Sequence, residues 1–396
     1  MKKAVYQIYT SLFAVFYKIF GVVLPVNKKV ILFESSVGRS YSGNPKYIYE
    51  EMIRQSMDLE YCCVWVLEDS STHIPGNCKK VQKMRFKHLY YAATAGVSIT
   101  DSRQLDIFKK REGSILIQTW HGTPLKKLAL DMEIMNIGGD TDLLAYQRKF
   151  SQQTKEWDYL ISQNAYSTDK FKSAFAYGGE IWEIGYPRND VLLRCNSEDA
   201  VWQLKLKLSL PIDKKIILYA PTWRDDEFYE QGKWKLTLHF NLDKMKERLG
   251  SEYVLVIKQH YFVQDDMLVD PKHKQFIYIY QPQQDIQMLY LVADIMITDY
   301  SSVLFDYSLL KKPMIFYWYD YEKYKNELRG FYIDFKEEAP GPIVLNERQL
   351  VEAIETLESN NHSYQKKYEN FFNKYNYLDD GNSSMRAVEK IKKILK

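Results

Sequence analysis

Short apolar runs, separated by polar segments that contain Gly, Pro, Asn or Asp, dominate the pattern of hydrophobic and polar positions along the chain. Such runs are typical of parallel strands, because these strands are buried on both faces of the sheet. The expected strands are residues 28–34, 61–67, 96–101, 115–119, 158–162, 181–184, 215–220, 253–257, 294–298 and 313–318. The segments between them predict helices, among them residues 45–53, 196–211, 285–292 and much of 346–396.

One arrangement occurs twice, about 200 residues apart. Residues 96–101 and 294–299 each form an apolar run that ends in Thr-Asp, and each predicts a short helix and a further strand after it. The repeat predicts two doubly wound α/β domains of similar topology with a cleft between them. We expect these domains at residues 27–195 and 196–396, with C-terminal helices packing back on the first domain.

The N-terminal segment, residues 1–26, is almost continuously apolar. On a helix, small and polar residues form one narrow stripe and large apolar residues cover the rest. No small-residue cleavage site follows, which argues against a cleaved signal peptide. The pattern favours a helix that lies in the plane of a membrane surface, and it leaves open a signal anchor or a helix packed into the core.

The composition, with 46% hydrophobic and 27% charged residues, is that of a globular protein. Residues 1–130 contain 19 Lys and Arg against 10 Asp and Glu, whereas the rest has 35 against 41. A basic excess beside an apolar N-terminus indicates an anionic membrane surface as partner, and no motif supports nucleic acid. The four cysteines have no metal-site or disulfide spacing, which fits a reducing compartment.

A basic run with interleaved aromatic residues follows the second expected strand. It is either a solvated helix face or a surface for a phosphate-rich polymer or membrane. The cations that we assign to an acceptor or membrane side are Lys79, Lys80, Lys83, Arg85, Lys87, Lys126 and Lys127.

His121 ends an apolar run at the point where Gly122 permits a sharp turn, and Pro124 suits the first position of a helix over residues 125–130. Open α/β sheets bind ligands at the carboxyl ends of their strands. A histidine placed there can exchange a proton near neutral pH. The alternative is a turn histidine that only caps the helix.

Other polar residues follow expected strands and should gather at the same edges: Arg188, Thr222, Arg224, Lys258, His260, Asp299, Ser301 and Ser302. Cations, imidazoles and a hydroxyl-rich helix N-terminus are suited to a diphosphate. Dinucleotide and P-loop fingerprints are absent. The set therefore indicates phosphoryl transfer, in which two histidines share proton donation and acceptance.

Two further features stay ambiguous. The Ser/Gly-rich loop at residues 35–44 is either an anion site or a plain connection. Asp225 and Asp226 are either metal ligands or a solvated loop, and the chemistry requires no metal and no cofactor.

Four segments resemble the signatures of the CDP-glycerol glycerophosphotransferases of teichoic acid synthesis: residues 120–126, 185–190, 219–224 and 297–306. Residues 33–35 and 41–51 are similar to that family's N-terminal segment. The resemblance implies a GT-B fold and peripheral attachment to the inner face of a Gram-positive membrane. It also implies transfer of a polyol phosphate from CDP-glycerol or CDP-ribitol to a lipid-linked polymer, with release of CMP.

The resemblance also implies residue roles. His121 matches the proposed general base and His260 the second active-site histidine. Residues in motifs that surround the donor phosphates are Arg188, Thr222, Arg224, Ser301 and Ser302, with Asp306 in the same signature as the two serines; Lys258 and Asp299 complete the expected donor side. The donor polyol, the acceptor and self-association into a homo-oligomer stay open.

Two other functions remain alternatives. One is a GT-B glycosyltransferase that uses a nucleotide sugar, and the other is a non-catalytic protein that binds an anionic polymer at the membrane.

Overall fold

The computed structural model describes residues 2–135, 141–222, 224, 228–230, 233–234, 237–258, 270–281, 283–324, 330–357 and 361–396. Contacts divide the chain into two compact units. The first comprises Met1–His121, Arg148–Asp190 and Asn382–Lys396, and the second comprises Gly122–Gln147 and Val191–Gly381. The expected boundary after residue 195 therefore differs from the observed division, in which the chain passes between units four times.

The first unit is built on a seven-stranded sheet in the order β3-β2-β1-β4-β5-β6-β7, and all its printed strand pairs are parallel. Its first strand, β1, lies third in this order and beside β4, so the order reverses between β1 and β4. The strands are β1 (Asn27–Glu34), β2 (Cys62–Leu67), β3 (Cys78–Gln82), β4 (Ala95–Thr100), β5 (Ile115–Gln118), β6 (Tyr159–Ser162) and β7 (Glu180–Glu183).

The first unit, together with the segments in which the chain passes between the units, contains eight α-helices in its described residues. They are α1 (Lys2–Val23), α2 (Gly43–Arg54), α3 (Met57–Glu60), α4 (Phe86–Thr94), α5 (Leu143–Thr154), α6 (Ala165–Phe175), α7 (Asp190–Arg194) and α17 (Ser383–Leu395), with 3-10 turns η1 (Ser36–Gly38), η2 (Ala129–Asp131) and η3 (Pro187–Asn189).

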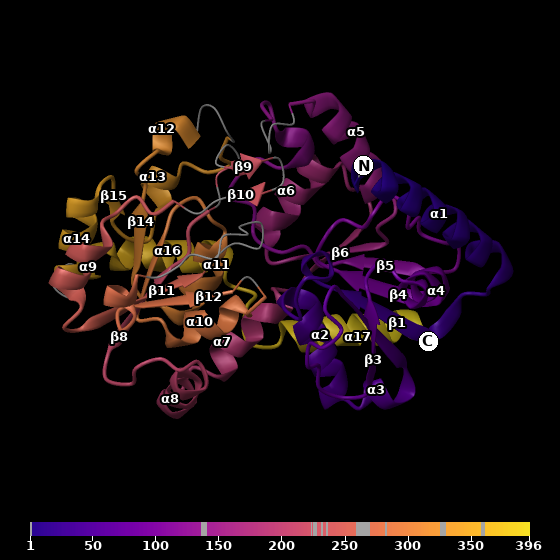
Figure 1. The fold of residues 1–396 in the computed structure, drawn as a ribbon, viewed down its shortest axis with the longest axis horizontal. Helices are drawn as coiled ribbons and strands as arrows, with labels where there is room; N and C mark the ends of the chain where they lie inside the picture. Colours follow the sequence, from indigo (N-terminus) through magenta and orange to yellow (C-terminus); the bar gives the residue numbers. More distant parts are fainter. Residues whose placement is uncertain are drawn as a thin grey trace. The chain divides into compact units, whose positions relative to one another are not determined.

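The C-terminal helix α17 belongs to the first unit, where it lies beside α2 (Figure 1). Val388 and Ile391 pack in the same core cluster as Ile48 of α2. Asp190 binds the start of α17, since its carboxylate accepts hydrogen bonds from the Ser383 and Ser384 amides at 2.9 and 2.8 Å. The other C-terminal helices remain in the second unit.

Helix α1 packs on α4 through one face. Phe13 and Tyr17 are buried in a cluster with Leu89. In the stripe of small and polar residues, Thr10, Ala14 and Gly21 are partly buried, whereas Ser11 and Lys18 are exposed. The large apolar side chains of the opposite face are exposed: Ile8, Leu12, Val15, Phe16, Ile19, Val22 and Val23. Among the described residues, no helix combines the length and hydropathy that crossing a membrane requires.

The second unit contains a six-stranded sheet in the order β12-β11-β8-β13-β14-β15, whose printed pairs are parallel. This is the order of the first sheet's first six strands, with the reversal between β8 and β13. The strands are β8 (Lys215–Tyr219), β11 (Tyr253–Lys258), β12 (Ile277–Tyr280), β13 (Ile295–Thr298), β14 (Met314–Tyr317) and β15 (Ile343–Val344), and β9 (Phe228–Glu230) pairs separately with β10 (Lys233–Trp234).

The helices that accompany this sheet are α8 (Glu198–Lys207), α9 (Leu242–Leu249), α10 (Ile286–Val292), α11 (Val303–Tyr307), α12 (Tyr321–Lys323), α13 (Phe335–Glu338), α14 (Glu347–Glu355) and α16 (Gln365–Tyr375), with η4 (Pro271–His273), η5 (Ser308–Leu310) and η7 (Asn361–Tyr364).

Three local predictions are wrong. Residues 125–130 do not continue as an α-helix, because their backbone pairs with a distant segment: the Lys127 amide donates to Gly330 O, and Tyr332 N donates to Leu125 O. No helix separates β4 from β5. The basic run is an edge strand, β3, followed by α4, and not one helix.

The buried His88 of α4 makes the first unit sensitive to acid. Its Nδ1 accepts a hydrogen bond from the Met84 amide at 3.0 Å, and burial lowers the pKa of His88 to about 4. In the unfolded chain the pKa of His88 is near 6.5, so below that pH the unfolded chain binds more protons than the folded protein does. The free energy of unfolding therefore falls as the pH is lowered from about 6.5 to 4, by up to about 3 kcal/mol.

We expect His88→Asn, whose side-chain oxygen can replace the Nδ1 acceptor, to lose this part of the pH dependence. Denaturant unfolding of both proteins at pH 7 and pH 5 measures it. An equal fall in stability for the variant would contradict the assignment.

Candidate active site

His121 lies just beyond the carboxyl end of β5, with an exposed side chain. Its Nδ1 lies 2.8 Å from the backbone oxygen of Asp101, the residue that follows β4. A carbonyl oxygen only accepts hydrogen bonds, so Nδ1 carries the proton and the neutral ring has its lone pair on Nε2. This tautomer leaves Nε2 able to accept a proton.

The surroundings of His121 keep its ring neutral. Dense packing around the ring lowers the pKa of His121 to about 4, and the cations Arg188 and Arg103 act in the same direction. The hydrogen bond to Asp101 opposes this effect. Because the ring also reaches solvent, water limits the desolvation, and the downward direction is what matters: at pH 7 His121 is neutral.

The turn that presents His121 is strained and well supported. Trp120 has φ of +52°, a left-handed conformation that is rare for a bulky residue. Its ring stacks on His121 and packs against Phe175, with centroids 4.5 and 4.6 Å away. The Arg188 Nη1 donates to His121 O at 2.7 Å, so Arg188 contacts the backbone of the candidate base.

A buried carboxylate stands where the first sheet reverses. Asp101 Oδ1 accepts hydrogen bonds from the Ser36 amide at 2.8 Å and from Ser102 Oγ at 2.6 Å. Burial raises the pKa of Asp101 to about 6, and these hydrogen bonds limit the rise. The Ser36 amide lies in the loop after β1, where an external anion could have bound. Asp101 of the protein itself accepts its hydrogen bond instead.

The second sheet repeats this arrangement at its own reversal. Asp299 follows β13, and its Oδ1 accepts a hydrogen bond from the amide of Thr222, which follows β8, at 2.8 Å. Arg224 Nη1 donates to Asp299 Oδ2 at 2.8 Å, and Arg224 Nε donates to Asp320 Oδ2 at 2.7 Å. Arg224 therefore joins the ends of β8, β13 and β14.

Arg224 is committed to these partners. It is 3% exposed, and four of its five N–H groups donate to Thr222 O, Asp299 and Asp320. Burial opposes its charge, but Asp299 and Asp320 outweigh burial and raise the pKa of Arg224 above its ordinary value. The expected phosphate ligand is, in this structure, a brace between loops.

Comparison with known proteins identifies the family. The sequence matches the CDP-Glycerol:Poly(glycerophosphate) glycerophosphotransferase family over residues 16–393. The chain belongs to this family.

Its relatives make teichoic acids. The chain is 40% identical to the teichoic acid poly(glycerol phosphate) polymerase of Bacillus spizizenii, over 99% of this chain and 100% of that protein. It is 28% identical to the poly(ribitol-phosphate) polymerase of the same organism, over 96% of this chain and 59% of that one. The chain spans about half the length of two further glycerol-phosphate polymerases that it matches.

Solved structures agree. The solved structure of the wall teichoic acid polymerase TagF superposes with a TM-score of 0.89 at 36% identity, over 99% of this chain and 96% of the chain in that structure. The UDP-GlcNAc 2-epimerase of Neisseria meningitidis, at 12% identity and a TM-score of 0.52, shows only that the fold is GT-B-like.

The remaining residues that were expected on the donor side of this glycerophosphotransferase lie at the carboxyl edge of the second sheet, apart from Asp306 within α11. Lys258 donates to Gln281 O at 2.7 Å, and burial lowers its pKa to about 7, against the influence of Asp285. Ser301 and Ser302 are partly exposed at the start of α11. Asp306 is buried, and its Oδ2 lies 3.5 Å from Gln287 Nε2. His260 lies outside the described residues, as do Asp225 and Asp226.

The basic residues expected on the acceptor or membrane side are divided between the two units. Lys79, Lys80, Arg85 and Lys87 are exposed in the first unit, whereas Lys83 is paired with Glu34 at 3.1 Å. Lys126 and Lys127 belong to the second unit. Lys126 donates to Tyr324 Oη at 3.2 Å, and Lys127 forms an ion pair with Glu133.

Sequence patterns missed three residues that shape the two sites: Asn44, Asp101 and Asp320. Asp101 had a signal, because it ends one copy of the repeat in which Asp299 ends the other. Asp320 and Asn44 act through partners about 100 and 75 residues away, and no local pattern reveals such pairings.

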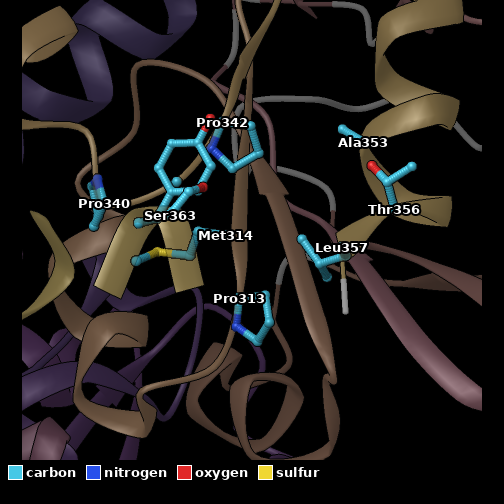
Figure 2. Close-up of a pocket in the computed structure, with 10 residues that line it drawn as sticks. Pro313, Met314, Pro340, Pro342, Ala353, Thr356, Leu357 and Ser363 are labelled. Atoms are coloured by element: carbon cyan, nitrogen blue, oxygen red, sulfur yellow. The ribbon is translucent and has the colours of Figure 1, made fainter. Parts of the chain in front are cut away.

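Two other observations narrow the site. Within the described part of the chain, no group of three His, Cys, Asp or Glu side chains could hold a metal ion. A cavity of about 270 Å³ lies at the amino end of β14, opposite the edge that carries Asp299 (Figure 2). The described residues that line it include three prolines, Met314 and Leu357 and no charged group, which does not suit phosphate chemistry.

The Arg224 brace predicts a large loss of stability. Arg224→Met leaves two carboxylates without their cation, so we expect unfolding to become easier by about 3–5 kcal/mol. Arg248→Met is the matched control, because it removes an exposed arginine that pairs with Glu355, and it should leave the unfolding transition nearly unchanged. Similar losses in denaturant titrations of the two variants would contradict the brace.

Proposed function

We propose that this chain transfers glycerol phosphate from CDP-glycerol to a terminal hydroxyl of a poly(glycerophosphate) acceptor and releases CMP. Its membership of the glycerophosphotransferase family supports the reaction class. The higher identity to a glycerol-phosphate polymerase (40%) than to a ribitol-phosphate polymerase (28%) supports glycerol. A TagF structure soaked with CDPG supports the donor.

The observation that carries the mechanism is the tautomer of His121. Nδ1–H is held by Asp101 O, which leaves Nε2 to take the proton of the acceptor hydroxyl. The acceptor oxygen then bonds to the β-phosphorus of the donor, and the bond between that phosphorus and the bridging oxygen breaks. CMP carries away the electron pair, and the protonated His121 returns its proton to solvent or to the leaving phosphate.

In this proposal the second unit holds the donor. Ser301, Ser302 and Lys258 would contact its phosphates, and the family resemblance assigns Arg188 and His260 to the same reaction. Thr222 Oγ1 is buried without a hydrogen-bond partner among the described residues, which suits a ligand there. Lys258, with a pKa near 7, would gain charge when an anionic phosphate approaches. Asp299 and Arg224 would shape the loop that follows β8.

We further propose that α1 holds the enzyme on an anionic membrane surface, where its acceptor is lipid-linked. The exposed apolar face of α1 continues into Phe86, which is 62% exposed and contacts Phe16 with ring centroids 5.7 Å apart. Arg85 and Lys87 flank Phe86 and are exposed. An apolar face with cations beside it is the composition of an interfacial helix.

The membrane proposal predicts the effect of charge on this face. Leu12→Glu with Ile19→Glu should weaken binding to phosphatidylglycerol-containing vesicles by about tenfold or more, since two apolar side chains no longer enter the bilayer. Leu59→Glu, at a residue 73% exposed on α3, is the control. Unchanged co-sedimentation of the double variant would refute the assignment.

The catalytic proposal predicts that His121→Ala lowers CMP release by about 10²–10⁴-fold while CDP-glycerol still binds. The exposed His73 provides the control variant, His73→Ala, which should keep normal turnover. Assays with CDP-glycerol, CDP-ribitol and UDP-GlcNAc, each with a defined lipid-linked acceptor, test the donor. Near-normal turnover of His121→Ala would remove His121 as the base, and UDP release would favour a glycosyltransferase.

A further inference from the structure

We propose that Asn44 is a positioning residue for His121, whose side chain holds the turn that sets the direction and tautomer of the imidazole. The inference rests on the proposed role of His121 as the base and adds the residue that keeps this base in place.

Asn44 makes three hydrogen bonds, and all of them lead to the His121 turn. It is fully buried in the first turn of α2. Its Nδ2 donates to Thr119 O and to Trp120 O, each at 3.1 Å. Its Oδ1 accepts a hydrogen bond from the Arg188 amide at 3.2 Å. Both donors and the acceptor of one amide are therefore used on the two segments that meet at His121.

The hydrogen bonds from Asn44 Nδ2 hold a turn whose backbone conformation is strained. Trp120 is held in the left-handed region, which L-residues with large side chains avoid. Such a conformation persists only when its surroundings over-determine it. The packed Trp120 ring supplies one constraint, and the hydrogen bonds from Asn44 to the two carbonyls before His121 supply the other.

Hydrogen bonds hold both the backbone and the ring of His121. Asn44 holds the Arg188 amide, and Arg188 Nη1 donates to His121 O at 2.7 Å. On the other side, the ring donates to Asp101 O. If the turn relaxes, the ring moves relative to Asp101 O, and the choice of tautomer is lost with it.

Asparagine suits this position better than other polar residues. Aspartate would place a carboxylate oxygen against the two carbonyl oxygens and has no donor. Serine has one donor and one acceptor, so it could replace only part of the set. The requirement is for a short side chain with two donors and one acceptor in one plane.

The test combines kinetics with NMR of the full-length protein labelled with ¹⁵N-histidine. Only seven histidines are present, so the His121 signals can be assigned by their absence in His121→Ala. For Asn44→Ala we expect turnover to fall by about 10²-fold with the KM for CDP-glycerol unchanged, since a displaced base slows the chemical step. We also expect the Nδ1–H tautomer to become mixed and the pKa of His121 to move up toward its ordinary value. Arg188, Arg103 and Asp101 are the charged groups around the ring.

The control is Tyr49→Phe, which removes another buried hydrogen bond of α2, from Tyr49 Oη to Pro75 O at 2.8 Å. It should leave tautomer and turnover as they are. Asn44→Ser serves if the alanine variant does not fold, and it should give an intermediate shift.

The outcomes separate the two proposals. A lower melting temperature for the Asn44 variants, with tautomer, titration and turnover retained, would overturn the positioning role. Full turnover of His121→Ala would instead overturn the proposed base, while the tautomer signals would still decide the role of Asn44.

Discussion

Two buried carboxylates support both halves of this protein. In a sheet whose order reverses, the loops after the first and fourth strands diverge, and backbone amides at the gap need partners. Asp101 and Asp299 meet this need in the same way, each by accepting an amide from the loop after the first strand. The proposed base and the Arg224 brace depend on these residues, because His121 binds the carbonyl of Asp101 and Arg224 binds the side chain of Asp299.

Much of this architecture could be predicted because buried parallel strands leave a strong pattern. The apolar runs located ten strands, including β1, β4, β8 and β13, and the Thr-Asp repeat indicated that both halves share a topology. The candidate residues His121, Thr222 and Asp299 were found for the same reason, since each follows such a run. The exposed apolar face of α1 was readable too, as the wide side of an amphipathic helix.

The errors have one cause, which is pairing between distant segments. Residues 125–130 have a helical sequence, yet their amides and carbonyls bind residues 330–332. Arg224 was expected beside the donor phosphates, and no local pattern revealed that the carboxylates of Asp299 and Asp320 enclose it. The edge strand β3 carries lysines on a short segment, so its pattern is that of a solvated helix. Local propensity cannot report partners that only the fold brings together.

The position of α17 has a consequence for biosynthesis. The first unit needs residues 383–395 to complete the core that Ile48 and Ile391 share, and these residues leave the ribosome after all of the second unit. The nascent first unit therefore waits with an uncovered apolar surface on α2, while the second unit can already collapse. The exposed face of α1 is synthesised before residue 121, so under the proposed membrane role it would reach a bilayer before the proposed base is held in a finished domain.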